Sequence, residues 1–124
     1  MKDLRIVLVD DSPIIRDYLD TALARIQGCT IVGMAADGVE AVKVIHDLRP
    51  HVVVLDITMP HRNGIDVLRE IRKEDAKMVI IMFTADPSIV LEDICLKEGA
   101  NHYLSKWEVV DLISICKELA SKVA

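Results

Sequence analysis

The sequence predicts an α/β domain in which a five-stranded parallel sheet is doubly wound, with five helices on its two faces. Short, nearly unbroken apolar runs alternate along the chain with segments of helical period. Several runs are rich in β-branched residues, which is typical of strands buried on both faces of a parallel sheet. The 124 residues suffice for one domain and are too few for two, so we expect a single domain over residues 1–124.

Five apolar runs are the expected strands. They cover residues 6–9, 30–35, 52–55, 78–83 and a short stretch around 103–104. In such folds ligands bind beyond the carboxyl ends of the strands. Functional side chains are therefore expected where these runs end.

Four of the intervening segments carry apolar residues at helical spacing, within residues 15–26, 41–48, 65–71 and 109–123. Tyr18 belongs to the stripe of the first. Ser12 and Pro13 give that helix an N-cap followed by proline at the first helical position. The segment 87–98 is less regular, and it begins with the same signature, Asp86-Pro87. Glycines mark the junctions between elements, at Gly28, Gly38, Gly64 and Gly99.

Composition narrows the function. The net charge of −5 and the 3% of aromatic residues argue against binding to nucleic acid, which needs clustered cations or exposed stacking rings. The N-terminus has no signal-peptide core, and no apolar run reaches the ~18 residues of a membrane span. Cys29, Cys95 and Cys116 have no metal-ligand spacing and are interpreted as buried apolar residues. We expect a cytoplasmic protein that binds neither nucleic acid nor membrane.

Polar groups follow four of the five expected strands: Asp10-Asp11, Asp56, Thr84 and Ser105-Lys106. Three carboxylates at one edge would repel each other unless a hard divalent cation bound them. Asp11 and Asp56 are the candidate direct ligands of Mg²⁺, and Asp10 is a candidate ligand through water. A carboxylate such as Asp56 is also a possible nucleophile that forms an acyl phosphate.

Each of these residues also has a purely structural interpretation. Asp10 or Asp11 alone would favour the N-terminus of the first helix through its dipole, and Asp56 alone would form a turn. Thr84 is a common strand-end residue, and a loop lysine such as Lys106 is usually solvated. Only their expected meeting at one edge favours a metal and phosphoryl site.

The whole chain resembles the receiver domains of two-component response regulators, the CheY-like proteins. The residues that carry the resemblance are Val9-Asp10-Asp11-Ser12, Leu55-Asp56-Ile57-Thr58-Met59-Pro60 with Gly64, Phe83-Thr84-Ala85, and Gly99-Ala100 leading to Tyr103-Leu104-Ser105-Lys106. The resemblance implies the flavodoxin-like strand order 2-1-3-4-5.

The resemblance also implies site roles. Asp56 would accept a phosphoryl group from a sensor histidine kinase or a phosphotransfer protein. Asp10 and Asp11, with Asp56 and the backbone carbonyl of Thr58, would hold Mg²⁺, or Mn²⁺ in its place. The domain would assist its own phosphorylation and dephosphorylation without being a true enzyme.

Further residues would bind the phosphoryl group and respond to it. The resemblance implies that Lys106, Thr84 and the backbone N–H of Ala85 bind its oxygens. Tyr103 would be a switch aromatic that turns inward as Thr84 moves; its alternative is a half-buried packing residue. A downstream protein would then bind the surface of the fourth helix, fifth strand and fifth helix.

Two features concern rate and geometry. Thr58 and Asp86 occupy positions that modulate decay of the acyl phosphate in this family. The family usually has proline after the lysine, often with a cis bond, whereas Trp107 stands here. Because a non-proline cis bond costs about 3 kcal/mol, we expect the Lys106–Trp107 bond to be trans. Trp107 is either a lone exposed aromatic or a partner anchor.

The chain is either a stand-alone receiver or a module of a longer regulator with a DNA-binding output domain. A phosphatase with an aspartyl nucleophile of the haloacid-dehalogenase kind would need a second aspartate where Thr58 stands. Flavin binding would need a hydroxyl- and glycine-rich loop after the first strand, and Asp10-Asp11-Ser12-Pro13 has the wrong charge.

Overall fold

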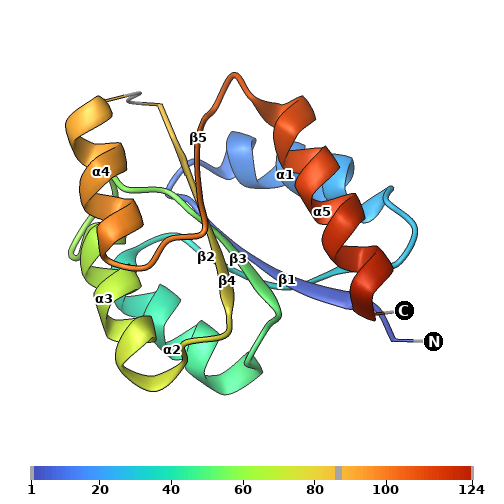
Figure 1. Cartoon of the computed structure of the whole chain (residues 1–124), viewed down its shortest axis with the longest axis horizontal. Helices are drawn as coiled ribbons and strands as arrows, with labels where there is room; N and C mark the ends of the chain where they lie inside the picture. The colour runs from blue at the N-terminus through green and yellow to red at the C-terminus, as the bar shows by residue number, and fades with distance from the viewer. Residues whose placement is uncertain (1, 86–87, 124) are drawn as a thin grey trace.

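The computed structural model describes residues 2–85 and 88–123, in which five strands alternate with five helices (Figure 1). The strands are β1 (Leu4–Val9), β2 (Cys29–Ala35), β3 (Val52–Leu55), β4 (Val79–Thr84) and β5 (His102–Ser105). The helices are α1 (Pro13–Ala24), α2 (Gly38–Leu48), α3 (Gly64–Glu74), α4 (Ile89–Lys97) and α5 (Val109–Val123). Each element overlaps the segment in which the sequence predicted it.

All strands of the sheet are parallel, in the predicted order β2-β1-β3-β4-β5. At the carboxyl edge Val9 lies beside both Ala35 and Leu55, and Thr84 lies beside Ser105. The residues that follow these positions therefore emerge together at one edge of the sheet.

The helices cover both faces of the sheet, as expected (Figure 1). One apolar core includes Ala41 of α2, Leu68 of α3 and Cys95 of α4. The opposite core includes Leu23 of α1 and Leu112 of α5. Thus α2, α3 and α4 pack on one face, and α1 and α5 pack on the other.

Two expectations about the helices need correction. Tyr18 was expected on the apolar face of α1, but its side chain is 54% exposed. α4 was expected from residue 87 with Asp86 as its N-cap, yet it begins at Ile89, because the Ser88 hydroxyl accepts the N–H of Leu91 at 3.3 Å and caps the helix. Asp86 and Pro87 themselves lie outside the described residues. The N-cap Ser12 of α1 is confirmed.

The three cysteines are buried and free, which confirms their interpretation as small apolar residues. Within the described chain, no helix is long and apolar enough to cross a membrane.

Candidate functional site

Three carboxylates meet at the carboxyl edge of the sheet. Asp10 directly follows β1 and donates its N–H to the Ala35 carbonyl at 3.1 Å, while Asp56 follows β3 and donates its N–H to the Val9 carbonyl at 3.0 Å. Extended strand pairing thus fixes both backbones. One oxygen from each of Asp10, Asp11 and Asp56 lies within 4.8 Å of the others. Asp10 and Asp56 are buried, whereas Asp11 is exposed.

Lys106 reaches this cluster from the end of β5. Its N–H donates to the Thr84 carbonyl at 2.9 Å, which holds its backbone beside β4. Its ammonium Nζ lies 2.8 Å from Asp10 Oδ2 and 3.3 Å from Asp56 Oδ2. The side chain is only 16% exposed. One cation therefore bridges two buried carboxylates, and its contact with Asp10 was not predicted from the sequence.

The charges in this cluster do not balance, since three carboxylates face one ammonium. Burial raises the pKa of Asp56 above its ordinary value, and the charge of Asp10 raises it further. Lys106 and the N–H of Thr58 lower it without cancelling the effect. Burial lowers the pKa of Lys106, but hydrogen bonds and charges from Asp10 and Asp56 outweigh burial and leave it raised. The cluster is poised to bind added positive charge.

Backbone contacts around Asp10 were also missed by the sequence analysis. The Ser12 N–H donates to Asp10 Oδ1 at 2.9 Å, and Arg16 donates to the Asp10 carbonyl oxygen at 2.6 Å. The first contact is the local turn that an aspartate makes two residues on. This turn could have been predicted from the sequence, because Ser12 lies two residues after Asp10.

The loop after β3 closes tightly on the site. The Gly64 N–H donates to the Ile57 carbonyl at 2.7 Å. A Cβ on Gly64 would lie 2.0 Å from the Asp56 carbonyl oxygen, so only glycine fits there. The Thr58 side chain is exposed, and its backbone N–H bonds to the Asp56 carboxyl group. Close packing thus sets the path of the loop beside Asp56.

The remaining predicted residues lie at the same edge or near it. Thr84 ends β4 and is buried, and Ala85 follows it and is exposed. Tyr103 lies on β5, half-buried against the core under α2, α3 and α4. Among residues 2–85 and 88–123 no peptide bond is cis, so the predicted trans bond before Trp107 is confirmed. The Trp107 side chain is 85% exposed.

The donor set fits a hard divalent cation. Carboxylate oxygens are the ligands that Mg²⁺ prefers, and it binds through few of them while keeping waters. The exposed Asp11 leaves the cluster open to solvent on one side. A cation there would offset the excess negative charge beside Asp56.

Comparison with known proteins identifies the family. The family model of the response regulator receiver domain matches residues 6–117. The chain belongs to the response regulator receiver family. It is therefore a signalling domain of the CheY type from two-component signalling, as the resemblance implied.

Among its curated relatives, this receiver is 36% identical over 104 residues to the chemotaxis protein CheY of Thermotoga maritima, with 82% of this chain and 84% of the relative covered. It is 30% identical over 105 residues to the probable C4-dicarboxylate response regulator DctR of Bacillus subtilis. That match covers 85% of this chain but 46% of DctR. A protein-glutamate methylesterase/protein-glutamine glutaminase of Treponema denticola is 32% identical over 109 residues, which cover 86% of this chain and 29% of that relative.

Solved structures agree on the receiver fold. The response regulator domain of Thermotoga maritima CheB superimposes with a TM-score of 0.88 at 26% identity, covering 97% of this chain and 98% of that one. The CheY of the CheX-CheY-BeF3-Mg²⁺ complex from Borrelia burgdorferi gives a TM-score of 0.84 at 30% identity, with 92% and 90% covered.

Proposed function

We propose that this receiver accepts a phosphoryl group on Asp56 from a sensor histidine kinase or a phosphotransfer protein. The observation that carries the proposal is the bridging of Asp10 and Asp56 by the Lys106 ammonium at 2.8 and 3.3 Å. A buried carboxylate next to one cation and two further carboxylates is costly as a purely structural arrangement. The arrangement suits transfer of a phosphoryl group from a histidine nitrogen of the donor to a carboxylate oxygen of Asp56.

Asp10, Asp11 and Asp56, together with the backbone carbonyl of Thr58, would hold Mg²⁺ or Mn²⁺. When bound, the cation supplies charge that offsets the oxygens of the transferring group. The 4.8 Å cluster of carboxylate oxygens supports this ligand set. So does the presence of Mg²⁺ in the solved CheX-CheY complex, whose CheY is 30% identical to this chain.

The proposed transfer step uses the chain's own groups. A carboxylate oxygen of Asp56 attacks phosphorus in line with the bond to the donor histidine. That phosphorus–nitrogen bond breaks, and the leaving imidazole takes up a proton. Lys106, the hydroxyl of Thr84 and the N–H of Ala85 would bind the phosphoryl oxygens. Most of the catalysis is therefore positioning and neutralisation of charge.

The same residues would return the domain to its starting state. Water attacks the acyl phosphate at phosphorus, which regenerates the Asp56 carboxylate and releases inorganic phosphate. The Thr58 side chain is exposed and its backbone N–H bonds to the Asp56 carboxyl group, so Thr58 would influence the rate of this step. Asp86, to which the sequence assigned a similar influence, lies outside the described residues.

An apolar surface near the site suits the phosphodonor protein. Ile14 and Val110 lie at the starts of α1 and α5, two helices on the same face of the sheet, and are 79% and 77% exposed. Trp107, next to Lys106 in the chain, is exposed as well. Large exposed apolar side chains beside a reactive group are typical partner anchors.

The downstream protein would bind α4, β5 and α5. Ile89 and Val90 of α4 are exposed, and Cys95 is the buried residue of that helix within the described chain. Tyr103 of β5 is half-buried and packs against the core, and it would couple this surface to Thr84. Because the matched region spans 46% of DctR, a role as the receiver module of a longer regulator, with a DNA-binding output domain, is a second candidate.

Incubation with acetyl phosphate and Mg²⁺ tests the proposal. We expect an acid-stable, base-labile mass increase of one phosphoryl group, lost when EDTA is present. It should be absent in Asp56→Asn and retained in Asp17→Asn, because Asp17 is an exposed aspartate on α1. Labelling that is independent of metal, or that persists in Asp56→Asn, would show that the proposal is wrong.

A further inference from the structure

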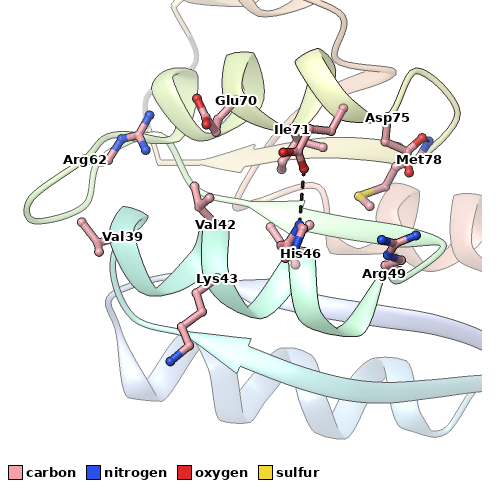
Figure 2. Close-up of a pocket in the computed structure, with 12 residues that line it drawn as sticks. Val39, Val42, Lys43, His46, Arg49, Arg62, Glu70, Ile71, Asp75 and Met78 are labelled. Carbon is pink, nitrogen blue, oxygen red and sulfur yellow. Dashed lines mark hydrogen bonds and ion pairs between the residues drawn. The ribbon is translucent and has the colours of Figure 1, made fainter.

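The carboxylate of Glu108 is bonded to the backbone and not to a cation. In the groove of about 450 Å³ between α2 and α3, three carboxylates face three lysine or arginine side chains, and Glu74 lies 3.4 Å from His46 across the two helices (Figure 2). Glu108, in contrast, has no cationic nitrogen within 4.0 Å among residues 2–85 and 88–123. Its Oε1 accepts the N–H of Ser105 at 2.9 Å.

Two hydrogen bonds join Glu108 to Ser105. The Ser105 N–H donates to the Glu108 carboxylate, and the Glu108 N–H donates to the Ser105 carbonyl at 3.0 Å. The second bond closes a turn with Lys106 and Trp107 at its centre. Neither of these two residues has a positive φ, so the turn is of type I. Proline at position 107 would disfavour the backbone conformation that this turn needs at Lys106. Hydrogen bonds, and not a proline ring, therefore hold the turn.

The turn connects two elements that are fixed by packing. Ser105 is the buried last residue of β5 and pairs with Thr84 of β4. The Lys106 N–H donates to the Thr84 carbonyl at 2.9 Å. On the other side, the Glu108 carbonyl accepts the N–H of Leu112 at 3.1 Å, in the first turn of α5. The Glu108 side chain thus ties the end of β5 to the start of α5, and Lys106 lies between them.

The two central side chains of the turn have opposite surroundings. The Lys106 side chain is 16% exposed and its ammonium contacts Asp10 at 2.8 Å and Asp56 at 3.3 Å. The Trp107 side chain is 85% exposed. A lysine side chain has many rotamers and loses entropy when it is held in one of them. A backbone that already directs Lys106 toward the carboxylates limits how far its ammonium can move away.

We propose that Glu108 is a positioning residue for Lys106. By accepting the Ser105 N–H, its carboxylate holds the turn in the geometry in which the Lys106 ammonium bridges Asp10 and Asp56. The effect of Glu108 on phosphoryl transfer rests on the proposed function, whereas its effect on the bridge does not. A misplacement of about 1 Å can slow a reaction about 100-fold, so the contact should matter for the rate.

The side-chain carboxyl ¹³C shifts of Asp10 and Asp56, measured by NMR on metal-free protein, test the positioning. Lys106→Met removes the ammonium and should shift both resonances. Glu108→Ala should shift them in the same direction by a smaller amount, because the ammonium then leaves its contacts for part of the time. Glu108→Gln keeps an oxygen acceptor for the Ser105 N–H and should retain the wild-type shifts.

Asp75→Ala is the matched control. Asp75 Oδ1 also accepts backbone N–H groups, at 2.7 and 2.9 Å, but it does so before β4, at the opposite edge of the sheet. Its loss should leave both carboxyl resonances unchanged. In the Lys106→Met background, Glu108→Ala should add no further shift, because the two residues act through the same ammonium.

Wild-type carboxyl shifts in Glu108→Ala would overturn the proposal. An effect of Glu108→Ala that persists in full in the Lys106→Met background would overturn it as well, because Glu108 would then act without the lysine. Neither measurement uses phosphorylation or metal. A failure of the positioning role is therefore distinguishable from a failure of the proposed function.

The initial rate of labelling by acetyl phosphate measures the consequence for transfer. We expect it to fall about tenfold in Glu108→Ala and to stay at the wild-type value in Glu108→Gln. Equal, measurable labelling rates of the wild type and Glu108→Ala would contradict a role in transfer.

Discussion

The two edges of the sheet are built from different chemistry. In the part of the chain that the structure describes, the buried polar and charged side chains are Asp10, Asp56, Thr84 and Ser105. All four lie at or just beyond the carboxyl end of a strand. The carboxyl edge therefore carries the cost of desolvating charge.

The amino edge is closed by backbone hydrogen bonds instead. The Leu4 N–H donates to the Gly28 carbonyl at 2.7 Å, and the His51 N–H donates to the Arg5 carbonyl at 2.9 Å. The exposed Asn101 accepts the Ile80 N–H through its side-chain oxygen at 2.8 Å. Polar groups at this edge therefore form hydrogen bonds with backbone groups and are not desolvated together as charges.

The difference between the two edges indicates that the carboxyl edge carries the functional site. At both edges the strands of the sheet end and their backbone groups need hydrogen-bond partners. Only the carboxyl edge holds several carboxylates clustered around a single lysine. Such a cluster does not favour the stability of the fold. Substitutions at the carboxyl edge should change phosphorylation, and substitutions at the amino edge should change stability alone.

The largest effect is expected from Lys106→Met, which removes the charge and keeps much of the apolar stem. Asp10 and Asp56 would then face each other without a cation. We expect labelling by acetyl phosphate to fall about 100-fold, and the free energy of unfolding in metal-free buffer to fall by about 3 kcal/mol. Mass spectrometry and urea titration measure the two quantities.

The matched control for this variant is Lys122→Met. Lys122 pairs with Glu118 at 3.7 Å, and both side chains are largely exposed. An exposed pair contributes little, so both quantities should stay unchanged. If Lys106→Met is labelled to the same extent as the wild type, Lys106 does not bind the phosphoryl group.

Gly64→Ala should have the next largest effect. The new Cβ would meet the Asp56 carbonyl oxygen, a backbone atom that cannot rotate away. We expect a loss of about 2–3 kcal/mol in the free energy of unfolding, and slower labelling because the Asp56 backbone shifts. In Gly33→Ala the nearest atom is the flexible end of the Leu48 side chain. That variant should lose less stability and label normally; equal labelling of the two variants would contradict the role of the loop.

Asp75→Ala tests the amino edge and should have the smallest effect. Asp75 Oδ1 accepts the N–H groups of Lys77 and Met78 at 2.7 and 2.9 Å, just before β4. We expect a loss of about 1 kcal/mol near neutral pH with labelling unchanged. Urea titration should give no loss for the exposed Asp47→Ala control.

The effect of Asp75 should also depend on pH. The hydrogen bonds from Lys77 and Met78 hold the pKa of this carboxyl group below its usual range. Its stabilisation is therefore complete above the unfolded pKa of about 3.9 and disappears as the pH falls through the lower folded pKa. A difference in the free energy of unfolding between wild type and Asp75→Ala that grows as the pH falls would contradict this prediction.

Most of the fold could be predicted because unbroken apolar runs and segments of helical spacing alternate regularly along the chain. Runs such as residues 52–55 are apolar at every position, and α3 repeats its apolar residues at helical spacing. The start of α4 was wrong because Asp86-Pro87 and Ser88 are competing caps. Local preference alone does not decide between them.

The site was predictable to a lesser degree. Strand-end positions brought Asp10, Asp56 and Lys106 together correctly, because parallel strands end at one edge. The sequence did not predict that Lys106 lies closer to Asp10 than to Asp56. It also did not reveal the groove between α2 and α3, since that depends on which side chains pair across two helices.

Trapping the acyl phosphate would show directly whether Asp56 is the phosphoacceptor. Borohydride reduces an acyl phosphate of aspartate to homoserine, and tandem mass spectrometry locates that residue in a peptide. After incubation with acetyl phosphate and Mg²⁺, we expect homoserine at position 56 and nowhere else. Homoserine at position 10 or 11, or labelling without homoserine at position 56, would contradict it.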